Sequence, residues 1–191
     1  WHDVAARYSL RSAETASFPS VVFASDLSSL ATIKVVSDGY PLRGQVRIAN
    51  NLFGDQRIAE GVPSRGSIWA DSALMARLGV DVGDRISVGE LDVSVDAVLM
   101  YRPDQSIGFS SLAPSLLLNM GDLDATGLIS DGSRIRYAML VAGLDDNVDA
   151  FYDEIEGQLP ENVGRSRRGA RPGIDAERRS RSIGMDRWGL S

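Results

Sequence analysis

Residues 67–98 constrain the fold most, because each change of direction along them is marked by a residue suited to that position. An apolar strand over 67–70 precedes Asp71, whose carboxylate can accept hydrogen bonds from the first free N–H groups of a helix. The helix is expected to reach Leu78, and Gly79 suits the left-handed position that follows a last helical turn. A strand and a short, capped helix are therefore predicted here.

A hairpin is predicted directly after this helix. The segments 85–88 and 91–100 flank Gly89 and Glu90, a pair suited to a tight turn. Apolar residues alternate in the second segment, which indicates one buried and one exposed face. Together these elements are typical of a helix that packs across a small barrel or sheet.

The rest of the chain combines short strands with one long amphipathic helix. That helix is predicted over 145–159, where apolar residues recur at helical spacing and acidic residues open the first turn. A final arginine-bearing helix is predicted over 175–188. Other strands are predicted over 17–24, 30–37, 44–49, 115–119 and 134–141, with a helical turn over 121–127. The fold class is α+β, since strands and helices do not alternate as in a doubly wound sheet.

Charge is divided unevenly along the chain. The 191 residues hold 20 Lys and Arg against 26 Asp and Glu, a net charge of −6. Residues 161–191 contain eight arginines and four acids, a net charge of +4, which leaves −10 for residues 1–160. An acidic body argues against a nucleic-acid partner, which needs a basic face to neutralise phosphates. The basic end is expected either to pair with the body or to lie beside another charged surface.

Two residue counts exclude several kinds of catalytic site. The chain has no cysteine and one histidine, His2, at an end that is expected to fray. Disulfides, thiolate nucleophiles and cysteine-ligated metals are therefore excluded, and a Ser-His-Asp triad would depend on His2. The glycine-rich motifs that bind nucleotide phosphates are missing, and no apolar run reaches the about 18 residues of a membrane span.

Three weaker patterns each have a simpler structural interpretation. Residues 122–127 resemble the start of a calcium loop, but Ser133 stands where that motif needs a glutamate, so a capped helical turn is expected. Lys34 could activate a serine, although its strand pattern predicts an exposed lysine. Asp92 and Asp96 share one face of a strand, which fits a solvated edge as well as paired catalytic carboxylates. No catalytic, cofactor-binding or metal-binding residue is expected.

The candidate partner-binding residues are Tyr40 and Arg43. Between them Pro41 fixes φ, and Gly44 after them permits a positive φ, so the chain is expected to reverse and present both side chains. Tyrosine and arginine often anchor protein interfaces, although the same turn could simply close a hairpin.

Residues 67–98 resemble the periplasmic core domain of ABC transporter permeases of the MacB/FtsX/LolCE type, in which a helix ending in Leu-Gly precedes a Gly-Asp-x-Ile-x-Val-Gly hairpin. Two further runs, residues 34–44 and 122–134, resemble one branch, the YbbP-like permeases associated with an extracytoplasmic lysophospholipase or esterase. The ending over 185–188 resembles the entry to a second membrane helix. Together the matched runs follow one another in order along about half of the chain.

The resemblance implies that residues 1–191 are a single extracytoplasmic domain, cut from between two transmembrane helices of an inner-membrane permease and facing the periplasm. It implies two lobes, an α/β lobe of residues 1–40 plus 104–191 and an inserted β-rich lobe of residues 41–103. ATP hydrolysis would occur in a separate cytoplasmic ABC ATPase subunit. The domain itself, which is not an enzyme, would pass motion of the membrane helices to the periplasm. The implied partners are a lipid-like or hydrophobic cargo and a periplasmic esterase, lysophospholipase or carrier protein.

Two alternatives stay open on the residues alone. One is a small barrel-type hydrolase that uses carboxylates or a serine paired with Lys34. The other is a stand-alone binding or scaffolding module, for which no membrane helices would flank the chain. The hydropathy of the neighbouring sequence separates both alternatives from the permease interpretation.

Overall fold

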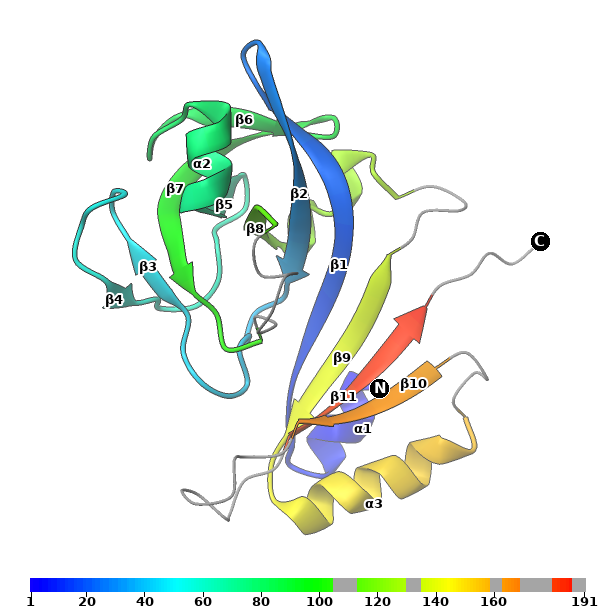
Figure 1. Ribbon diagram of the computed structural model, residues 1–191. Helices are drawn as coiled ribbons and strands as arrows, with labels where there is room; N and C mark the ends of the chain where they lie inside the picture. Colours follow the sequence, from blue (N-terminus) through cyan, green and yellow to red (C-terminus); the bar gives the residue numbers. More distant parts are fainter. Residues whose placement is uncertain (105–112, 130–134, 159–162, 169–179, 187–191) are drawn as a thin grey trace.

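The structure, a computed structural model, describes residues 1–104, 113–129 and 135–158, together with the backbone of residues 163–168 and 180–186 (Figure 1). Its elements, in chain order, are α1 (His2–Arg7), β1 (Arg11–Ala24), β2 (Leu27–Val36), β3 (Arg47–Ala49), β4 (Arg57–Ile58), β5 (Ser67–Asp71), α2 (Ser72–Leu78), β6 (Arg85–Val88), β7 (Leu91–Tyr101), β8 (Ser115–Asn119), the 3₁₀ turns η2 (Met120–Asp122) and η3 (Asp124–Thr126), β9 (Arg136–Ala142), α3 (Asp145–Glu156), β10 (Val163–Arg168) and β11 (Ser180–Asp186). No helix in these described ranges is both long and apolar enough to cross a bilayer.

Six strands close into a barrel (Figure 1). β1 pairs with β2, β2 with β8, β8 with β5, β5 with β7 and β7 with β6, and β6 returns to β1. Each of these strands contributes buried apolar side chains to one core, and α2 packs against that core through Leu74, Met75 and Leu78. Burial of each such side chain stabilises the fold by roughly 1.5–3 kcal/mol, so the barrel is the main source of stability in this part of the chain.

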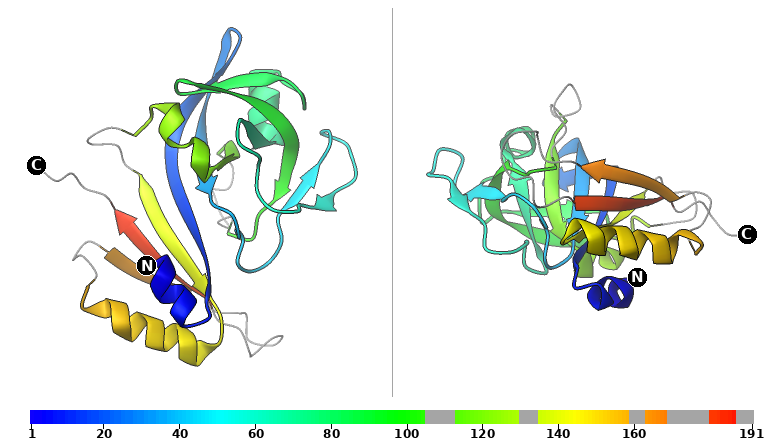
Figure 2. Two further views of the ribbon diagram at one scale, coloured as in Figure 1. Left: turned by 180° about the vertical axis from the view of Figure 1, so that it is seen from behind. Right: turned by 90° about the horizontal axis from the view of Figure 1, so that it is seen from below.

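A second, antiparallel sheet continues from the first half of β1, in the order β10, β11, β9, β1. The helices α1 and α3 cover one face of this sheet (Figure 2). From that face Met139 and Val141 of β9 pack against Phe151 and Ile155 of α3. The sheet and its two helices therefore form a layered unit with a core of its own.

β1 belongs to both the barrel and the helix-covered sheet. Its 14 residues pair with β9 over Arg11–Ser17 and with β6 at Val22 and Phe23. At about 3.3 Å per residue the strand spans about 45 Å. Pro19 pairs with Thr32 of β2 and lies between the residues of β1 that pair with β9 and those that pair with β6. Its missing N–H therefore interrupts neither the β9 nor the β6 ladder. The proline is thus compatible with an unbroken strand.

A third group of buried side chains fills the space between the barrel and the second sheet. Trp69 and Leu117 face outward from the barrel, and Ala13 and Ala142 face them from β1 and β9. Tyr40 and Leu42, in the turn that follows β2, complete this group. The turn is therefore packed between the two units.

Several sequence predictions are confirmed. Asp71 caps α2 by accepting a hydrogen bond from Leu74 N at 2.7 Å, and Gly79 has the left-handed φ of 63° expected after the helix. Gly89, at the hairpin turn, has a φ of 62°. The long helix is present as α3, with Val148, Phe151, Tyr152 and Ile155 buried along one side. Leu159, the last residue predicted in it, lies outside the described residues.

Other predictions were wrong. Residues 180–186 form strand β11 instead of part of a helix, because the edge of β9 offers a ladder and Gly184 disfavours a helix interior. The first residues form α1, whose His2 contacts β1 and whose Arg7 contacts α3, where a frayed end was expected. The strand expected over 44–49 is confined to β3.

The two-lobe division and its bounds stay a prediction. Three strands of the barrel, β1, β2 and β8, lie outside residues 41–103.

Candidate functional site

A cluster of charged and polar side chains lies where the barrel meets the turn that follows β2. We call Lys34, Tyr40, Arg102 and Asp104 the junction cluster. Lys34 Nζ lies 2.9 Å from Asp104 Oδ2, and the Tyr40 hydroxyl donates to Asp104 Oδ1 at 2.6 Å. Arg102 Nε lies 3.9 Å from the same carboxylate. Asp104 thus connects β2, the turn after it and the end of β7.

The cluster is largely shielded from water, and this sets the charge state of Asp104. Burial alone raises the pKa of the Asp104 carboxyl, because a charge is less favourable away from water. The Lys34 ammonium and the hydrogen bond from Tyr40 act in the opposite direction, and Arg102 adds to them. Together they hold the pKa of Asp104 below its ordinary value, so the carboxylate is charged at neutral pH.

Lys34 is therefore not the exposed strand lysine that the pattern predicted. Its side chain is 16% exposed, and its ammonium is held by Asp104. The ammonium of Lys34 is thus directed at a carboxylate, whereas a Ser–Lys nucleophile pair needs the amine beside a serine hydroxyl. The geometry favours a structural role over the Ser–Lys34 hydrolase.

Tyr40 and Arg43 occupy the turn as predicted, but Tyr40 is not presented to solvent. Tyr40 is 3% exposed and packs with Leu42 between the barrel and the second sheet. The Leu42 carbonyl accepts a hydrogen bond from Arg11 Nη2 of β1 at 2.7 Å, and Arg43 is partly buried. Gly44 has a φ of 72°, and a Cβ there would lie 2.7 Å from Pro103 Cβ. The turn is therefore an internal brace, and partner binding by Tyr40 and Arg43 stays a prediction.

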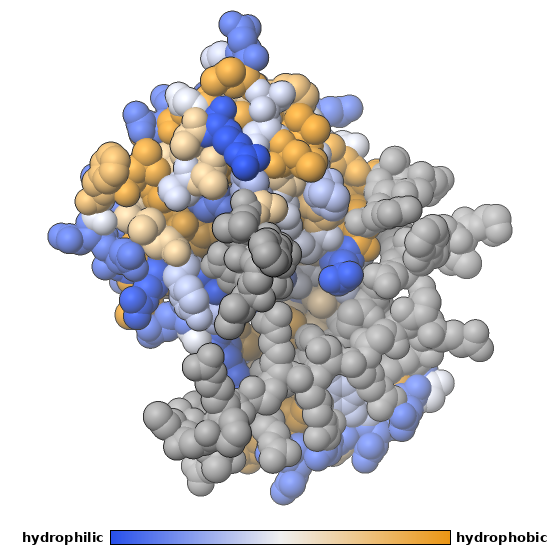
Figure 3. Space-filling model, viewed as in Figure 1, coloured by the Kyte–Doolittle hydropathy of each residue, from blue (hydrophilic) through white to orange (hydrophobic). Residues whose placement is uncertain are grey.

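The hairpin of β1 and β2 projects beyond the barrel, at the opposite end of the molecule from α1 (Figure 1). Val21 is 42% exposed and lies directly opposite Leu30, which is 62% exposed. Phe23 and Leu27, nearer the tip, are each 50% exposed. Apolar side chains also gather near this tip in the space-filling view (Figure 3). Sequence alternation predicted strands here, but it could not show that these side chains face water.

Asp92 and Asp96 lie on the exposed face of β7, as predicted. Asp92 accepts a hydrogen bond from the Ser87 hydroxyl, and Asp96 accepts one from the Ser94 hydroxyl at 3.0 Å. Each carboxylate is thus bonded to a serine in open solvent. This arrangement fits a solvated face and gives no support to paired catalytic carboxylates.

His2 joins α1 to β1. Its Nδ1 lies 2.8 Å from the Ser12 hydroxyl, and its Nε2 lies 2.7 Å from Glu14 Oε1. These contacts resemble a Ser-His-Glu triad, but the His2 and Glu14 side chains are 48% and 49% exposed. Such exposure is typical of a docking contact rather than of a water-excluded catalytic site.

α1 is also attached to α3. Arg7 pairs with Glu154, and the amide of Asn147 donates to the Tyr8 carbonyl at 2.9 Å. The Tyr8 hydroxyl donates to Glu154, which lowers the pKa of the Glu154 carboxyl and raises the pKa of Tyr8. The N-terminal helix is therefore fixed to both the strand and the long helix.

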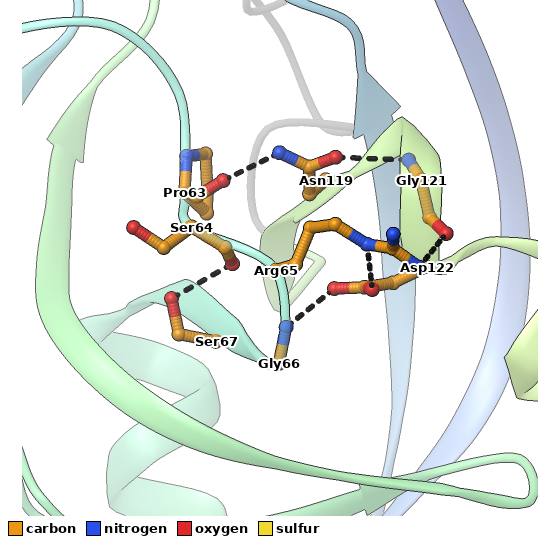
Figure 4. Close-up of polar contacts among 8 residues, drawn as sticks. All are labelled: Pro63, Ser64, Arg65, Gly66, Ser67, Asn119, Gly121 and Asp122. Carbon is orange, nitrogen blue, oxygen red and sulfur yellow. Dashed lines mark hydrogen bonds and ion pairs between the residues drawn. The ribbon is translucent and has the colours of Figure 1, made fainter.

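The segment that resembled a calcium loop forms a bracing network (Figure 4). Asp122, with 7% of its side chain exposed, accepts from Gly66 N at 2.6 Å and pairs with Arg65 Nε at 3.2 Å. Asn119 donates to the Pro63 carbonyl at 2.8 Å and accepts from Gly121 N. In the described ranges no group of three or more His, Asp or Glu side chains could hold a metal ion. Ser133 lies outside those ranges. The contacts of Asp122 are those of a structural carboxylate.

We predict that Asp122→Ala lowers the free energy of unfolding by about 2 kcal/mol, because the Gly66 N–H loses the charged acceptor that the buried Asp122 side chain supplies. Asp124→Ala is the matched control, since Asp124 is exposed in the next turn and its loss should cost less than about 0.5 kcal/mol. Chemical denaturation measures both. A calcium-dependent rise in melting temperature that Asp122→Ala abolishes would restore the calcium interpretation.

Sequence reasoning missed two parts of the site. Asp104 follows a strand and a proline, and a lone aspartate in such a place carries no signal of its distant partners Lys34 and Tyr40. The exposed apolar residues of the hairpin were seen as strand residues only. In their case the absence of charge over residues 18–33, apart from Asp26, was the available signal.

The chain is similar to part of a protein of Escherichia coli K12 that is described as the uncharacterized ABC transporter permease YbbP. The two are 29% identical over 159 residues, which is 83% of this chain and 19% of that protein. The chain thus spans about a fifth of the length of this curated relative. No protein-family model matches the chain, and no solved structure matches it. The similarity supports a relationship to ABC transporter permeases, in agreement with the motif resemblance.

Proposed function

We propose that the chain is the extracytoplasmic domain of an ABC transporter permease and transmits ATP-driven motion of the membrane helices to a partner outside the cytoplasmic membrane. The similarity to a permease over 83% of the chain supports the first part of this proposal. One structural observation carries the second part. The strand β1 runs without a break from the sheet beneath α1 to the projecting hairpin. A displacement of α1 would therefore reach the hairpin along a single strand.

The contacts around β1 would keep the two units together during such a displacement. His2 joins α1 to Ser12 and Glu14 of β1. Arg11, at the start of β1, donates to the turn that follows β2, and Asp104 contacts both Lys34 and Tyr40. The domain would thus move as one body and not as two hinged lobes, even if it has the two-lobe architecture of MacB-type domains.

In this proposal α1 follows the first membrane helix and the domain lies in the periplasm. ATP is hydrolysed by a separate cytoplasmic ABC ATPase subunit, and the domain itself is not an enzyme. The transported or extracted cargo is lipid-like or hydrophobic, and a periplasmic esterase, lysophospholipase or carrier protein receives the motion or the cargo. The ion pair between Lys34 and Asp104 supports a mechanical role over hydrolysis.

Labelling in whole cells tests the location. The chain contains no cysteine, so Asp26→Cys places a single thiol at the exposed hairpin tip, in a full-length permease whose other cysteines have been removed. A membrane-impermeant maleimide should label this thiol in intact cells. Labelling that occurs only after the cytoplasmic membrane is opened would overturn the proposal.

A further inference from the structure

The projecting hairpin carries an apolar surface that the fold does not bury. We call Val21, Phe23 and Leu30 the hairpin ridge, because these three side chains leave the same face of the hairpin, whereas Leu27 is paired with the buried Ala24 on the other face. These three residues are 42–62% exposed. Single exposed apolar residues are common on protein surfaces, but a contiguous group marks an interaction site.

The ridge is held in a fixed arrangement before any partner arrives. β1 and β2 are paired in register over ten residue pairs, from Thr15 with Val36 to Ala24 with Leu27. Val21 and Leu30 are directly opposed, which places their Cβ atoms about 5 Å apart. On the other side of the tip, Leu27 lies beside Gly79 at the end of α2. A preordered surface of this kind loses little entropy on binding.

Acidic residues outnumber arginines on α2, β6 and β7, the elements that lie beside the hairpin or one strand away from it. Phe23 of β1 is paired with Ser87 of β6, and Ser87 is paired with Asp92 of β7. The Asp92 backbone therefore lies two strands, or about 10 Å, from that of Phe23. The only charged residue in the hairpin between positions 18 and 33 is Asp26 at its tip. Over residues 18–33 and 72–98 the exposed charged residues number six acids and two arginines, a net charge of −4; they are Asp26, Asp81, Asp84, Glu90, Asp92 and Asp96, with Arg77 and Arg85.

We propose that the hairpin ridge docks a protein whose contact face combines an apolar pocket with a rim of lysine or arginine. The apolar side chains supply the anchor, and the acidic surroundings select the basic rim and repel an anionic membrane. The inference rests on the proposed function only for the compartment in which the partner binds. The chemistry of the surface does not depend on the proposed function.

Photo-crosslinking in the full-length permease tests the inference. Benzoylphenylalanine replaces Phe23 in one protein and Phe53 in the control, because Phe53 is 98% exposed in the loop between β3 and β4, outside the hairpin. We expect position 23, and not position 53, to crosslink to a protein. That protein is then identified by mass spectrometry, purified, and titrated against the 191-residue chain.

Three results together support the inference. Phe23→Ser and Leu30→Ser each weaken binding by about tenfold or more, the value typical of a central anchor. Phe53→Ser leaves binding unchanged. Affinity falls with added salt and with the double change Asp26→Lys and Asp92→Lys, as electrostatic complementarity requires. Circular dichroism confirms that each variant is folded.

Other results would overturn it. Crosslinks to lipid, or binding of the chain to phosphatidylglycerol vesicles that Phe23→Ser abolishes, would identify a membrane surface instead. Crosslinks between two copies of the permease would identify self-association, and equal crosslinking from positions 23 and 53 would show no specific site. If salt-dependent protein binding is found but Asp26→Cys is labelled only from the cytoplasm, the chemistry of the ridge stands and the proposed function fails.

Discussion

Asp104→Ala is expected to lower the free energy of unfolding by about 2–4 kcal/mol. The substitution would leave the Lys34 ammonium and the Arg102 guanidinium, whose side chains are 16% and 13% exposed, without the carboxylate between them. Loss of one partner from a buried ion pair costs more than the pair itself contributes, because the remaining charge is desolvated and unpaired. Urea denaturation of the 191-residue chain measures the change.

Asp38→Ala is the control for Asp104→Ala. Asp38 is an exposed aspartate in the turn after β2, and its loss should change stability by less than about 0.5 kcal/mol. Equal losses in the two variants would show that the junction cluster does not brace the turn.

The contribution of Asp104 should also depend on pH. Its pKa is lower in the folded protein than in the unfolded chain, so the folded state favours the charged carboxylate. The stabilisation is complete above the ordinary aspartate value of about 3.9 and is lost as the pH falls through the lower folded pKa. The stability difference between the native chain and Asp104→Asn should therefore stay constant from about pH 7 to pH 5 and shrink in stronger acid. A difference that grows on acidification would contradict the assigned charge state.

Ala16→Pro is expected to cost about 3 kcal/mol or more and to disrupt the middle of β1. Ala16 is fully buried and is paired with Val35 of β2 on one side and Tyr137 of β9 on the other. A proline in a central strand removes a ladder hydrogen bond, and its ring crowds the neighbouring backbone. Thermal unfolding followed by circular dichroism measures the loss.

Pro19→Ala supplies the matched comparison in the same strand. At position 19 the strand lies between the pairings with β9 and β6, so a proline is tolerated there. Its removal should change stability by about 1 kcal/mol or less, mainly through the unfolded chain. Similar losses in the two variants would mean that β1 is not held from both sides at Ala16, and the mechanical path proposed along it would fail.

Local structure could be predicted from the sequence where short-range chemistry decides it. The cap of Asp71, the glycines at positions 79 and 89 and the apolar side of α3 depend on residues a few positions apart. β11 was wrongly predicted as helix because its conformation depends on an open edge of β9, some forty residues earlier in the chain. The barrel closes through pairs such as β2 with β8 and β6 with β1, and no local pattern specifies those pairs.

The candidate site shows the same limit. Lys34 and Tyr40 were noted in one motif, but Asp104, which joins them, lies 64 residues beyond the tyrosine. The turn residues were correctly expected to lie in a turn, whereas the burial of Tyr40 depends on a group of side chains that includes Trp69 and Leu117, far away in the sequence. Alternation could not show which face of the hairpin is covered, because that depends on where the barrel ends.

The central claim is that α1, the second sheet and the hairpin move as one body when the permease hydrolyses ATP. Spin labels at Asp26→Cys and Asp153→Cys, exposed positions on the hairpin tip and α3, report the distance across the domain. In the full-length permease with its ATPase, we expect this distance to be the same with and without ATP, while the separation of both labels from lipid-anchored probes changes together. A change in the distance between the two labels, with the α3 label fixed relative to the membrane, would contradict the claim and indicate a hinge between two lobes.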